Sequence, residues 1–453
     1  MSLIGPSLME WPGRVRSSFP LVIGGLAVGA VVAPTLLARG TLRAVRGEGP
    51  RASTIAGVGV AVGGLVAGGR IARTRFIRKT RDAARVIDPG FVDPPTSGLV
   101  STGPGSLVTA SDVGREGARY VGTSTAACDV KFVTGRKQTV EPIRVFIGLD
   151  AAPTIDERVD MAMAELRRTG AFDRSRLVIQ APAGTGYANA TPVDVVELLT
   201  RGDCASVAVG YGLLPSFLSL NRVEIARRTQ LALLNAIAEE CRSRTSCPRL
   251  LLYGESLGAK VQQAALPGGI HDLDRLGIDA ALWVGTPGGA DYDDAHLAFG
   301  PVAVTLDHPE QLPNVLRDLP DPRVWFLEHD GDPVVRFRPD LAYARPAWLS
   351  PAQGRGVPAD MAWRLGITWA QVLVDTVFAT DVTPGDFQSR GHDYRADLGA
   401  VATAAFGLAE TDAEPGWADR LEIRLRELEV RRAERVRGSL EAQRPRAPED
   451  PSP

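Results

Sequence analysis

The sequence predicts an α/β fold in which an N-terminal α-helical membrane region precedes a doubly wound, mostly parallel β-sheet. Three observations lead to this prediction. Short apolar runs rich in β-branched residues recur after residue 141, helical patterns separate several of these runs, and two long uncharged stretches precede them all. Strands that alternate with helices form βαβ units, and their helices cover both faces of a parallel sheet.

The pattern after residue 141 gives the order of the elements. The apolar runs predict strands over 143–149, 176–182, 206–212, 249–254, 280–285 and 323–328. Apolar residues recur with helical spacing over 156–169, 219–240 and 367–380. The densely charged segment 420–437 predicts a solvated helix.

The two uncharged stretches, residues 19–38 and 53–69, predict a membrane hairpin. The first is twenty residues long and fits the roughly 30 Å hydrocarbon core of a bilayer, whereas the second is slightly shorter and rich in glycine. A signal peptide and a soluble glycine-rich segment are the alternatives. Glycines four residues apart let helices pack closely in lipid, so three pairs predict helix packing within or between chains: Gly25/Gly29, Gly59/Gly63 and Gly64/Gly68.

The basic flanks predict an orientation in the membrane. The two outer flanks, 14–16 and 70–81, carry more arginine and lysine than the loop 39–51 that joins the two stretches. Because cytoplasmic flanks carry the excess of positive charge, we expect both termini and the α/β domain on the cytoplasmic side of the inner membrane. The predicted parts of the chain are a membrane region 1–81, a Pro/Gly/Ser/Thr-rich connector 82–135, an α/β domain 136–412, and a charged helix with a disordered tail 413–453.

Composition argues against several classes of protein. The formal net charge of −2 argues against a nucleic-acid-binding protein. The five histidines form no HExxH motif and no Cys/His cluster, so we expect no metal and no cofactor. Four cysteines are too few for a disulfide scaffold. Cys241 and Cys247 are close enough in sequence to pair, but we expect ordinary thiols in a reducing compartment.

The pentapeptide GESLG, residues 254–258, places one serine between two glycines where a strand-like run ends and a helix-like run begins. This context is the one that a nucleophile elbow requires, because a strained turn needs small neighbours and exposes the serine oxygen at the end of the sheet. The N-terminus of the following helix favours developing negative charge. The motif therefore predicts Ser256 as a nucleophile, and the alternative is an ordinary tight turn.

A serine hydroxyl needs a base to take its proton, and in hydrolases with this elbow the chain order is serine, then acid, then histidine. The loop after the predicted strand 323–328 offers Asp330 and Asp332, and His392 is the only histidine downstream of both. We expect His392 as general base and then general acid, and Asp332 as the residue that orients it. Asp330 and Glu328 are the alternative acids, and a polar loop histidine is the alternative for His392. The usual last strand is not evident before His392.

An oxyanion hole needs two N–H donors. The residue after the nucleophile, Leu257, supplies the first. The segment APAGTGY, residues 181–187, follows a predicted strand and offers flexible glycine backbone, so Thr185 or Gly184 is the candidate for the second. A phosphate-binding loop is the alternative, although no GK[ST] follows and GxGxxG is absent.

These motifs and several longer blocks resemble the actinobacterial membrane-anchored α/β-hydrolases of the "alpha/beta-hydrolase family 9" type. The resemblance covers about residues 98–400 and rests on blocks at 103–121, 142–174, 181–187, 202–220, 253–259, 327–335 and 391–394. It implies a hydrolase fold with nucleophile Ser256, acid Asp332 and histidine His392, and it implies that block 103–121 belongs to the catalytic unit. The family's membrane region usually has about four spans, whereas this sequence predicts two. The family supplies no defined substrate.

The sequence thus predicts a membrane-anchored serine hydrolase that cleaves an ester or thioester of an acyl or lipid-like substrate through an acyl-enzyme, without a cofactor. An acyltransferase that uses the same three residues is the enzymatic alternative. The alternative from another class is a non-catalytic membrane structural or partner-binding protein built on a hydrolase fold.

Overall fold

A computed structural model gives the structure of this chain. It describes residues 75, 78, 82–213, 223–289, 296–349, 354–379, 383–409 and 411–442. The predicted spans 19–38 and 53–69, with their glycine pairs, lie outside these residues. Within the described part of the chain, no helix is both long enough and apolar enough to cross a membrane.

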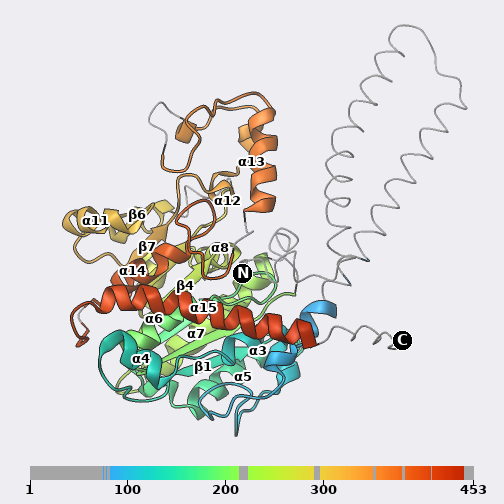
Figure 1. Cartoon of the computed structure of the whole chain (residues 1–453), viewed down its shortest axis with the longest axis vertical. Coiled ribbons are helices and arrows are strands. Elements are labelled where there is room, and N and C mark those ends of the chain that lie inside the picture. The colour runs from blue at the N-terminus through green and yellow to red at the C-terminus, as the bar shows by residue number, and fades with distance from the viewer. Residues whose placement is uncertain are drawn as a thin grey trace, which may run out of the picture. The chain divides into compact units, whose positions relative to one another are not determined.

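The centre of the fold is a sheet of seven strands in the order β1-β3-β2-β4-β5-β7-β6 (Figure 1). Every pair of neighbouring strands is parallel. The strands are β1 Ile143–Ile147, β2 Arg176–Ala181, β3 Cys204–Val209, β4 Arg249–Glu255, β5 Ile278–Val284, β6 Ala303–Leu306 and β7 Val324–Leu327. The prediction of an α/β fold with a parallel sheet is confirmed, and all six predicted strands are present.

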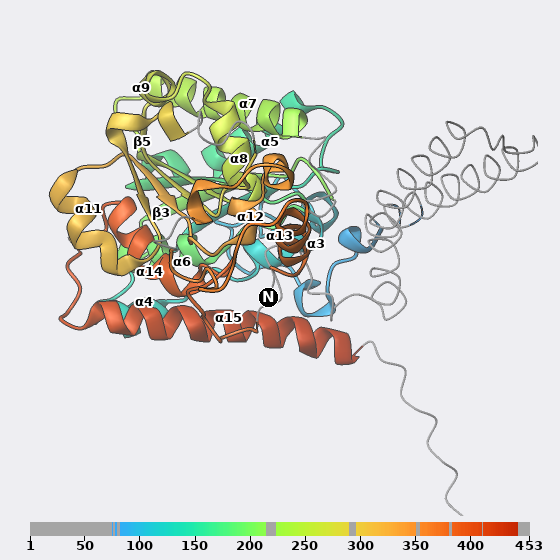
Figure 2. The same cartoon turned by 90° about the horizontal axis from the view of Figure 1, so that it is seen from above.

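Helices cover both faces of this sheet. Those described are α3 Ala110–Val121, α4 Ala127–Thr134, α5 Ile155–Arg168, α6 Thr191–Leu199, α7 Val223–Ser243, α8 Leu257–Ala265, α9 Ile270–Leu276, α11 Leu312–Asp318, α12 Pro333–Arg336, α13 Ile367–Phe378, α14 Arg395–Ala405 and α15 Trp417–Ala442. Short 3₁₀ helices are η1 Pro89–Phe91, η2 Ala171–Asp173, η5 Gly300–Val302, η6 Pro309–Gln311, η7 Pro339–Ala342 and η8 Ala347–Leu349. Helices α5, α7, α8 and α9 cover one face, and α6 and α14 cover the other, with α4 and α15 outside them (Figure 2).

The strands are apolar runs without alternation because both of their faces are buried. All five residues of β1 and all six of β3 are buried. The two aromatic side chains Trp283 and Phe326, on β5 and β7, pack at 5.4 Å between ring centroids in the core. This burial fixes the positions of the strand ends, from which the polar loops emerge.

Strand β6 was not predicted. It has four residues, three of which are only partly buried or exposed, so its sequence carries little of the apolar signal that marks the other strands. It pairs with β7 at the edge of the sheet although it precedes β7 in the chain. As the sequence indicated, no strand lies between Asp332 and His392 in the residues described there, and β6 occupies this edge of the sheet.

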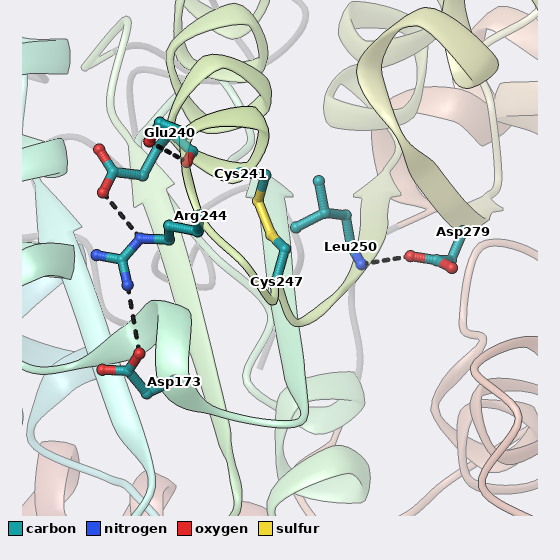
Figure 3. The surroundings of a disulfide bond; sticks show 8 residues. Asp173, Glu240, Cys241, Arg244, Cys247, Leu250 and Asp279 are labelled. Carbon is teal, nitrogen blue, oxygen red and sulfur yellow. Dashed lines mark hydrogen bonds and ion pairs between the residues drawn. A yellow bond between two sulfur atoms is a disulfide. The ribbon is translucent and has the colours of Figure 1, made fainter.

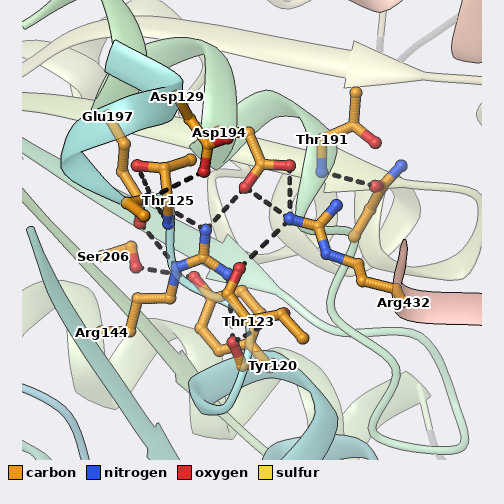
Figure 4. Close-up of polar contacts among 12 residues, drawn as sticks. Tyr120, Thr123, Thr125, Asp129, Arg144, Thr191, Asp194, Glu197, Ser206 and Arg432 are labelled. Carbon is orange, nitrogen blue, oxygen red and sulfur yellow. Dashed lines mark hydrogen bonds and ion pairs between the residues drawn. The ribbon is translucent and has the colours of Figure 1, made fainter. Parts of the chain in front are cut away.

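Helix α15 is held to the sheet by a buried group of charges (Figure 4). Arg144 of β1 is fully buried and contacts Glu197 at 2.6 Å and Asp194 at 2.7 Å. Arg432 of α15 contacts the other oxygen of Asp194 at 2.6 Å. The segment predicted as a solvated helix is helical, but Leu425 and its apolar neighbours on one face are buried. The sequence analysis missed this apolar stripe because charged residues predominate in the segment.

A disulfide joins Cys241, in the last turn of α7, to Cys247 in the turn that follows the helix (Figure 3). Their Cα atoms lie 5.3 Å apart, within the range that a disulfide requires. The expectation of two ordinary thiols was therefore wrong. The spacing in sequence allowed the two cysteines to pair but did not require it, and the turn brings them together. Arg244 within the turn contacts Glu240 and Asp173. Of the other cysteines, Cys128 is exposed and Cys204 is buried.

Candidate active site

Ser256 lies at a sharp turn between β4 and α8. Its backbone has φ 51° and ψ −125°, a region that residues other than glycine rarely adopt. The N–H of Ser256 donates to the carbonyl of Val284 on β5 at 2.9 Å, which fixes the turn to the neighbouring strand. Such strain persists only where the surrounding structure imposes it, and it is common at functional sites.

The two glycines of GESLG are required by close backbone contacts. A Cβ atom at Gly254 would lie 2.8 Å from the backbone of Ala259, and one at Gly258 would collide with the carbonyl oxygen of Ala181. The start of α8 therefore packs directly against the end of β2. The spacing of the motif follows from this packing, as a nucleophile elbow requires.

His392 and Asp332 form a buried pair. His392 Nδ1 lies 2.6 Å from Asp332 Oδ2, and both side chains are almost completely inaccessible. Burial alone would raise the pKa of Asp332, but the charge of His392 and hydrogen bonds from His392, Tyr394 and Val334 outweigh it and lower this pKa. Burial alone would lower the pKa of His392, but Asp332 outweighs it and the pKa is raised. The pair therefore favours an ionised aspartate.

Tyr394 is a partner of Asp332 that the sequence reasoning missed. Its hydroxyl donates to Asp332 Oδ2 at 2.6 Å and accepts from the backbone N–H of His329 at 3.0 Å. The N–H of Val334 donates to the other carboxylate oxygen at 2.8 Å. The signal was the tyrosine two residues after His392, but a contact across 62 residues cannot be read from spacing.

The side chains of Ser256 and His392 are not hydrogen-bonded to each other in this structure. His392 Nε2 is buried and has no hydrogen-bond partner among the residues that the structure describes. The imidazole lies against Gly285, where an added Cβ would be 2.8 Å from His392 Cε1, and Gly285 follows the residue that binds the N–H of Ser256. The two side chains thus occur at adjacent strand ends. Catalytic hydrogen bonds are often long without substrate.

The alternative acids have other partners. Asp330 Oδ1 accepts a hydrogen bond from Arg336 Nη2 at 2.6 Å, and its side chain is 41% exposed. Glu328 Oε1 lies 3.3 Å from His296 Nε2. Among the three acids considered, Asp332 is the one in contact with His392.

The two candidate oxyanion donors differ in position. Leu257 is the first residue of α8, so its N–H precedes the hydrogen bonds within the helix. Thr185 lies in the turn closed by the bond from the N–H of Ala183 to the carbonyl of Tyr187, at 2.7 Å. Ala183 and Tyr187 line a small cavity beside Ser256, whereas Thr185 lines a separate cavity. The structure does not bring Thr185 into the cavity at the serine.

The cavity beside Ser256 also contains Glu255, a buried carboxyl group that the sequence reasoning did not consider. Its Oε2 accepts hydrogen bonds from Asn189 at 2.7 Å and from Tyr253 at 3.1 Å. Its Oε1 is buried and has no partner within the described structure. Burial raises the pKa of Glu255 to about 7, although Asn189 and His392 oppose this shift. A second titratable group therefore adjoins the site.

Comparisons with known proteins identify the family of this chain. A search of curated proteins and a search of solved structures found no match. The site nevertheless has the elements of a hydrolase: a strained serine at a strand–helix turn and a histidine held by an aspartate at the neighbouring strand ends. The model described as "Alpha/beta-hydrolase family" matches residues 143–420, more than half of the sequence, and the chain belongs to this family.

Proposed function

We propose that this protein is a serine hydrolase that cleaves an ester or thioester of an acyl or lipid-like substrate through an acyl-enzyme. Family membership suggests a hydrolase. The observation that carries the proposal is the state of His392: one nitrogen is bound to Asp332, and the other is buried and unpartnered beside the Ser256 turn. An imidazole held in this way is prepared to accept a proton.

The proposed reaction has two halves. In the first, Ser256 Oγ attacks the carbonyl carbon and its proton passes to His392 Nε2. The C–O or C–S bond then breaks, and the leaving group takes that proton. In the second, His392 removes a proton from water, the water oxygen attacks the acyl carbon, and Ser256 leaves with the proton. Asp332 stabilises the imidazolium in both halves, and the N–H of Leu257 binds the oxyanion.

An acyltransferase would share the first half and replace water by another alcohol or a thiol. The missing Ser256–His392 hydrogen bond favours a further alternative, a non-catalytic protein with a hydrolase fold. The two alternatives differ in their expected reaction with a serine-directed probe. The transferase reacts with the probe, and the non-catalytic protein does not.

Activity-based labelling tests the proposal. Membranes that contain the full chain are treated with a fluorophosphonate, and Ser256→Ala is compared with Ser243→Ala, which removes an exposed hydroxyl at the end of α7. We expect labelling of the wild type and of Ser243→Ala, and none of Ser256→Ala. A folded wild type that fails to react would refute the proposal. Hydrolysis is then separated from transfer by measuring product distribution in the presence of added alcohols.

We also propose that residues 19–38 and 53–69 anchor the protein in the inner membrane, that the glycine pairs mediate packing of these helices, and that the catalytic domain lies in the cytoplasm. The basic flanks support this orientation. The Cys241–Cys247 disulfide argues for the opposite one, because disulfides are rare in reducing compartments.

The exposed thiol of Cys128 offers a test of the orientation. A membrane-impermeant maleimide should label it only after cell lysis if the domain is cytoplasmic. Labelling in intact cells that disappears in Cys128→Ser would place the domain outside and contradict the proposed orientation.

A further inference from the structure

A second buried histidine–aspartate pair lies beside His392 and takes no part in the chemistry proposed above. His329 Nε2 lies 2.7 Å from Asp397 Oδ2, and His329 Nδ1 lies 2.8 Å from the carbonyl oxygen of Gly391. The His329 side chain is 1% exposed. His329 follows β7, and Asp397 belongs to α14, so the pair joins the loop of the acid to the helix that follows His392.

Both nitrogens of His329 face hydrogen-bond acceptors. The carbonyl of Gly391 can only accept, and Asp397 Oδ2 already accepts from the hydroxyl of Ser389 at 2.7 Å. A neutral imidazole has a single N–H and would leave one of these contacts without a proton. The geometry therefore requires one additional proton in the pair, which corresponds to an imidazolium beside a carboxylate. The carboxylate compensates the charge that burial would otherwise make unfavourable.

Two hydrogen-bonded paths lead from His329 to the proposed triad. The first is direct, because the Gly391 carbonyl belongs to the residue before His392. The second passes through Tyr394, whose hydroxyl accepts from the His329 N–H and donates to Asp332. The Tyr394 ring also stacks on His329 at 4.0 Å between centroids. A single side chain thus contacts the backbone beside the base and the phenol that binds the acid.

We propose that His329 is a positioning residue for His392, and that it acts as the imidazolium of an ion pair with Asp397. This proposal rests on the proposed function, because it assigns His329 to the same reaction. The protonated form donates to both acceptors and fixes the loop that carries His392. The neutral form leaves one acceptor unpaired and releases one anchor of that loop.

The charged and titratable groups around His329 come from several elements. Asp397 lies on α14, and Glu422 of α15 is close enough to it that burial, and then the Asp397 carboxylate, raise the pKa of Glu422 to about 7. Asp307 follows β6 and accepts from the N–H of Asp330 at 2.8 Å, while Arg355 neutralises it at 2.6 Å. Tyr394 stacks on the ring. Among these groups, the Asp397 carboxylate is the one in contact with a ring nitrogen of His329.

The proposal predicts a fall in activity at alkaline pH that depends on His329. The rate of fluorophosphonate labelling and kcat/KM for a p-nitrophenyl ester are measured against pH for the full chain in membranes. We expect His329→Gln to be about tenfold slower near neutral pH, because a loosened base is misplaced, and to lack the alkaline fall. His271→Gln, which changes an exposed histidine on α9, should retain the wild-type profile.

A milder variant, Ser389→Ala, covers the case in which His329→Gln does not fold. The hydroxyl of Ser389 stabilises the Asp397 carboxylate, so its loss should strengthen the hold on the shared proton. The alkaline fall should then move to higher pH. The role of His329 is overturned if the alkaline fall in activity does not move in Ser389→Ala, or if His329→Gln keeps the wild-type pH profile. In either case, labelling of the wild type still upholds the proposed function. A wild type without labelling refutes the proposed function itself.

Discussion

Two buried histidine–aspartate pairs lie side by side in this protein, and they differ in one respect. His392 contacts Asp332 through one nitrogen and has no partner for the other among the described residues. His329 contacts Asp397 through one nitrogen and the Gly391 carbonyl through the other. Burial and a carboxylate partner are therefore common to both. In the proposed mechanism, the unpartnered nitrogen is what allows His392, and not His329, to exchange a proton with a substrate.

The largest expected effect separates the two histidines directly. We expect His392→Gln to lower kcat/KM by about a thousandfold or more, because the proposed proton acceptor is lost. The tenfold loss expected for His329→Gln is much smaller, since the acceptor itself remains. Steady-state kinetics at neutral pH measure both, with His271→Gln as the control. Equal losses in the two variants would show that the free nitrogen of His392 does not distinguish them.

Replacing the two aspartates should lower activity in the same order as replacing the two histidines. We expect Asp332→Asn to lower kcat by about 10³ to 10⁴, because an amide no longer stabilises the imidazolium or selects the tautomer. Asp397→Asn should lower it by about tenfold and should move the alkaline fall to lower pH, because the pair then holds its extra proton less strongly. The control is Asp318→Asn, whose carboxylate is exposed. A larger loss of kcat in Asp397→Asn than in Asp332→Asn would contradict the roles proposed for the two aspartates.

Tyr394 connects the two pairs, and its hydroxyl can be removed without changing the ring. Tyr394→Phe deletes one of the three donors to Asp332, a loss of about 1.5 kcal/mol for a charged hydrogen bond, or roughly tenfold in kcat. It also leaves the N–H of His329 without its acceptor. Tyr343→Phe, at an exposed tyrosine, is the matched control. Wild-type kcat in Tyr394→Phe would exclude a coupling through this phenol.

The smallest kinetic effect concerns Glu255, whose charge raises the pKa of His392 after the larger contributions of burial and Asp332. Glu255→Gln removes that charge, so the acidic limb of kcat/KM should move to lower pH by less than one unit, a factor below about ten. Glu310→Gln, at a carboxylate that is 91% exposed, should leave the limb unchanged. A shift to higher pH would contradict the assigned sign.

Stability against pH provides an independent test of Glu255. Its pKa of about 7 in the folded protein lies above the ordinary value of 4.5. Its contribution to the stability of the folded state is therefore full below pH 4.5 and is lost as the pH rises through 7. The free energy of unfolding, measured by thermal unfolding at pH 5 and at pH 8, should therefore fall less between these pH values for Glu255→Gln than for the wild type, by about 2–3 kcal/mol. Identical losses would mean that this carboxyl is already ionised at pH 5.

The contrast between the two pairs also explains what the sequence could predict. Strands such as 143–147 and 249–255 were predictable because full burial leaves an uninterrupted apolar run. Chain order selected Asp332 and His392, and the structure brings them into contact, while their catalytic role is the proposal made above. The GESLG motif indicated the strained turn because the turn is formed by consecutive residues.

The missed features depend on contacts between distant segments. His329 and Asp397 are 68 residues apart, and no local pattern relates them. Glu255 lies within the GESLG motif and Tyr394 within the block 391–394, yet each has a hydrogen-bond partner in a distant loop. Strand β6 is too short to carry an apolar signal, and its place at the edge is decided by β7. Tertiary structure alone provides this information.

The placement of β6 has a consequence for how such a protein can change over generations. Because β6, which precedes β7 in the chain, forms the edge of the sheet, no described strand uses residues 333–391, which separate Asp332 from His392. Their two ends are held together by the bond between these side chains. Insertions, deletions or exchanges in the middle of this segment, away from Val334, Ser389 and Gly391, can therefore be accepted while the sheet and the two pairs stay intact.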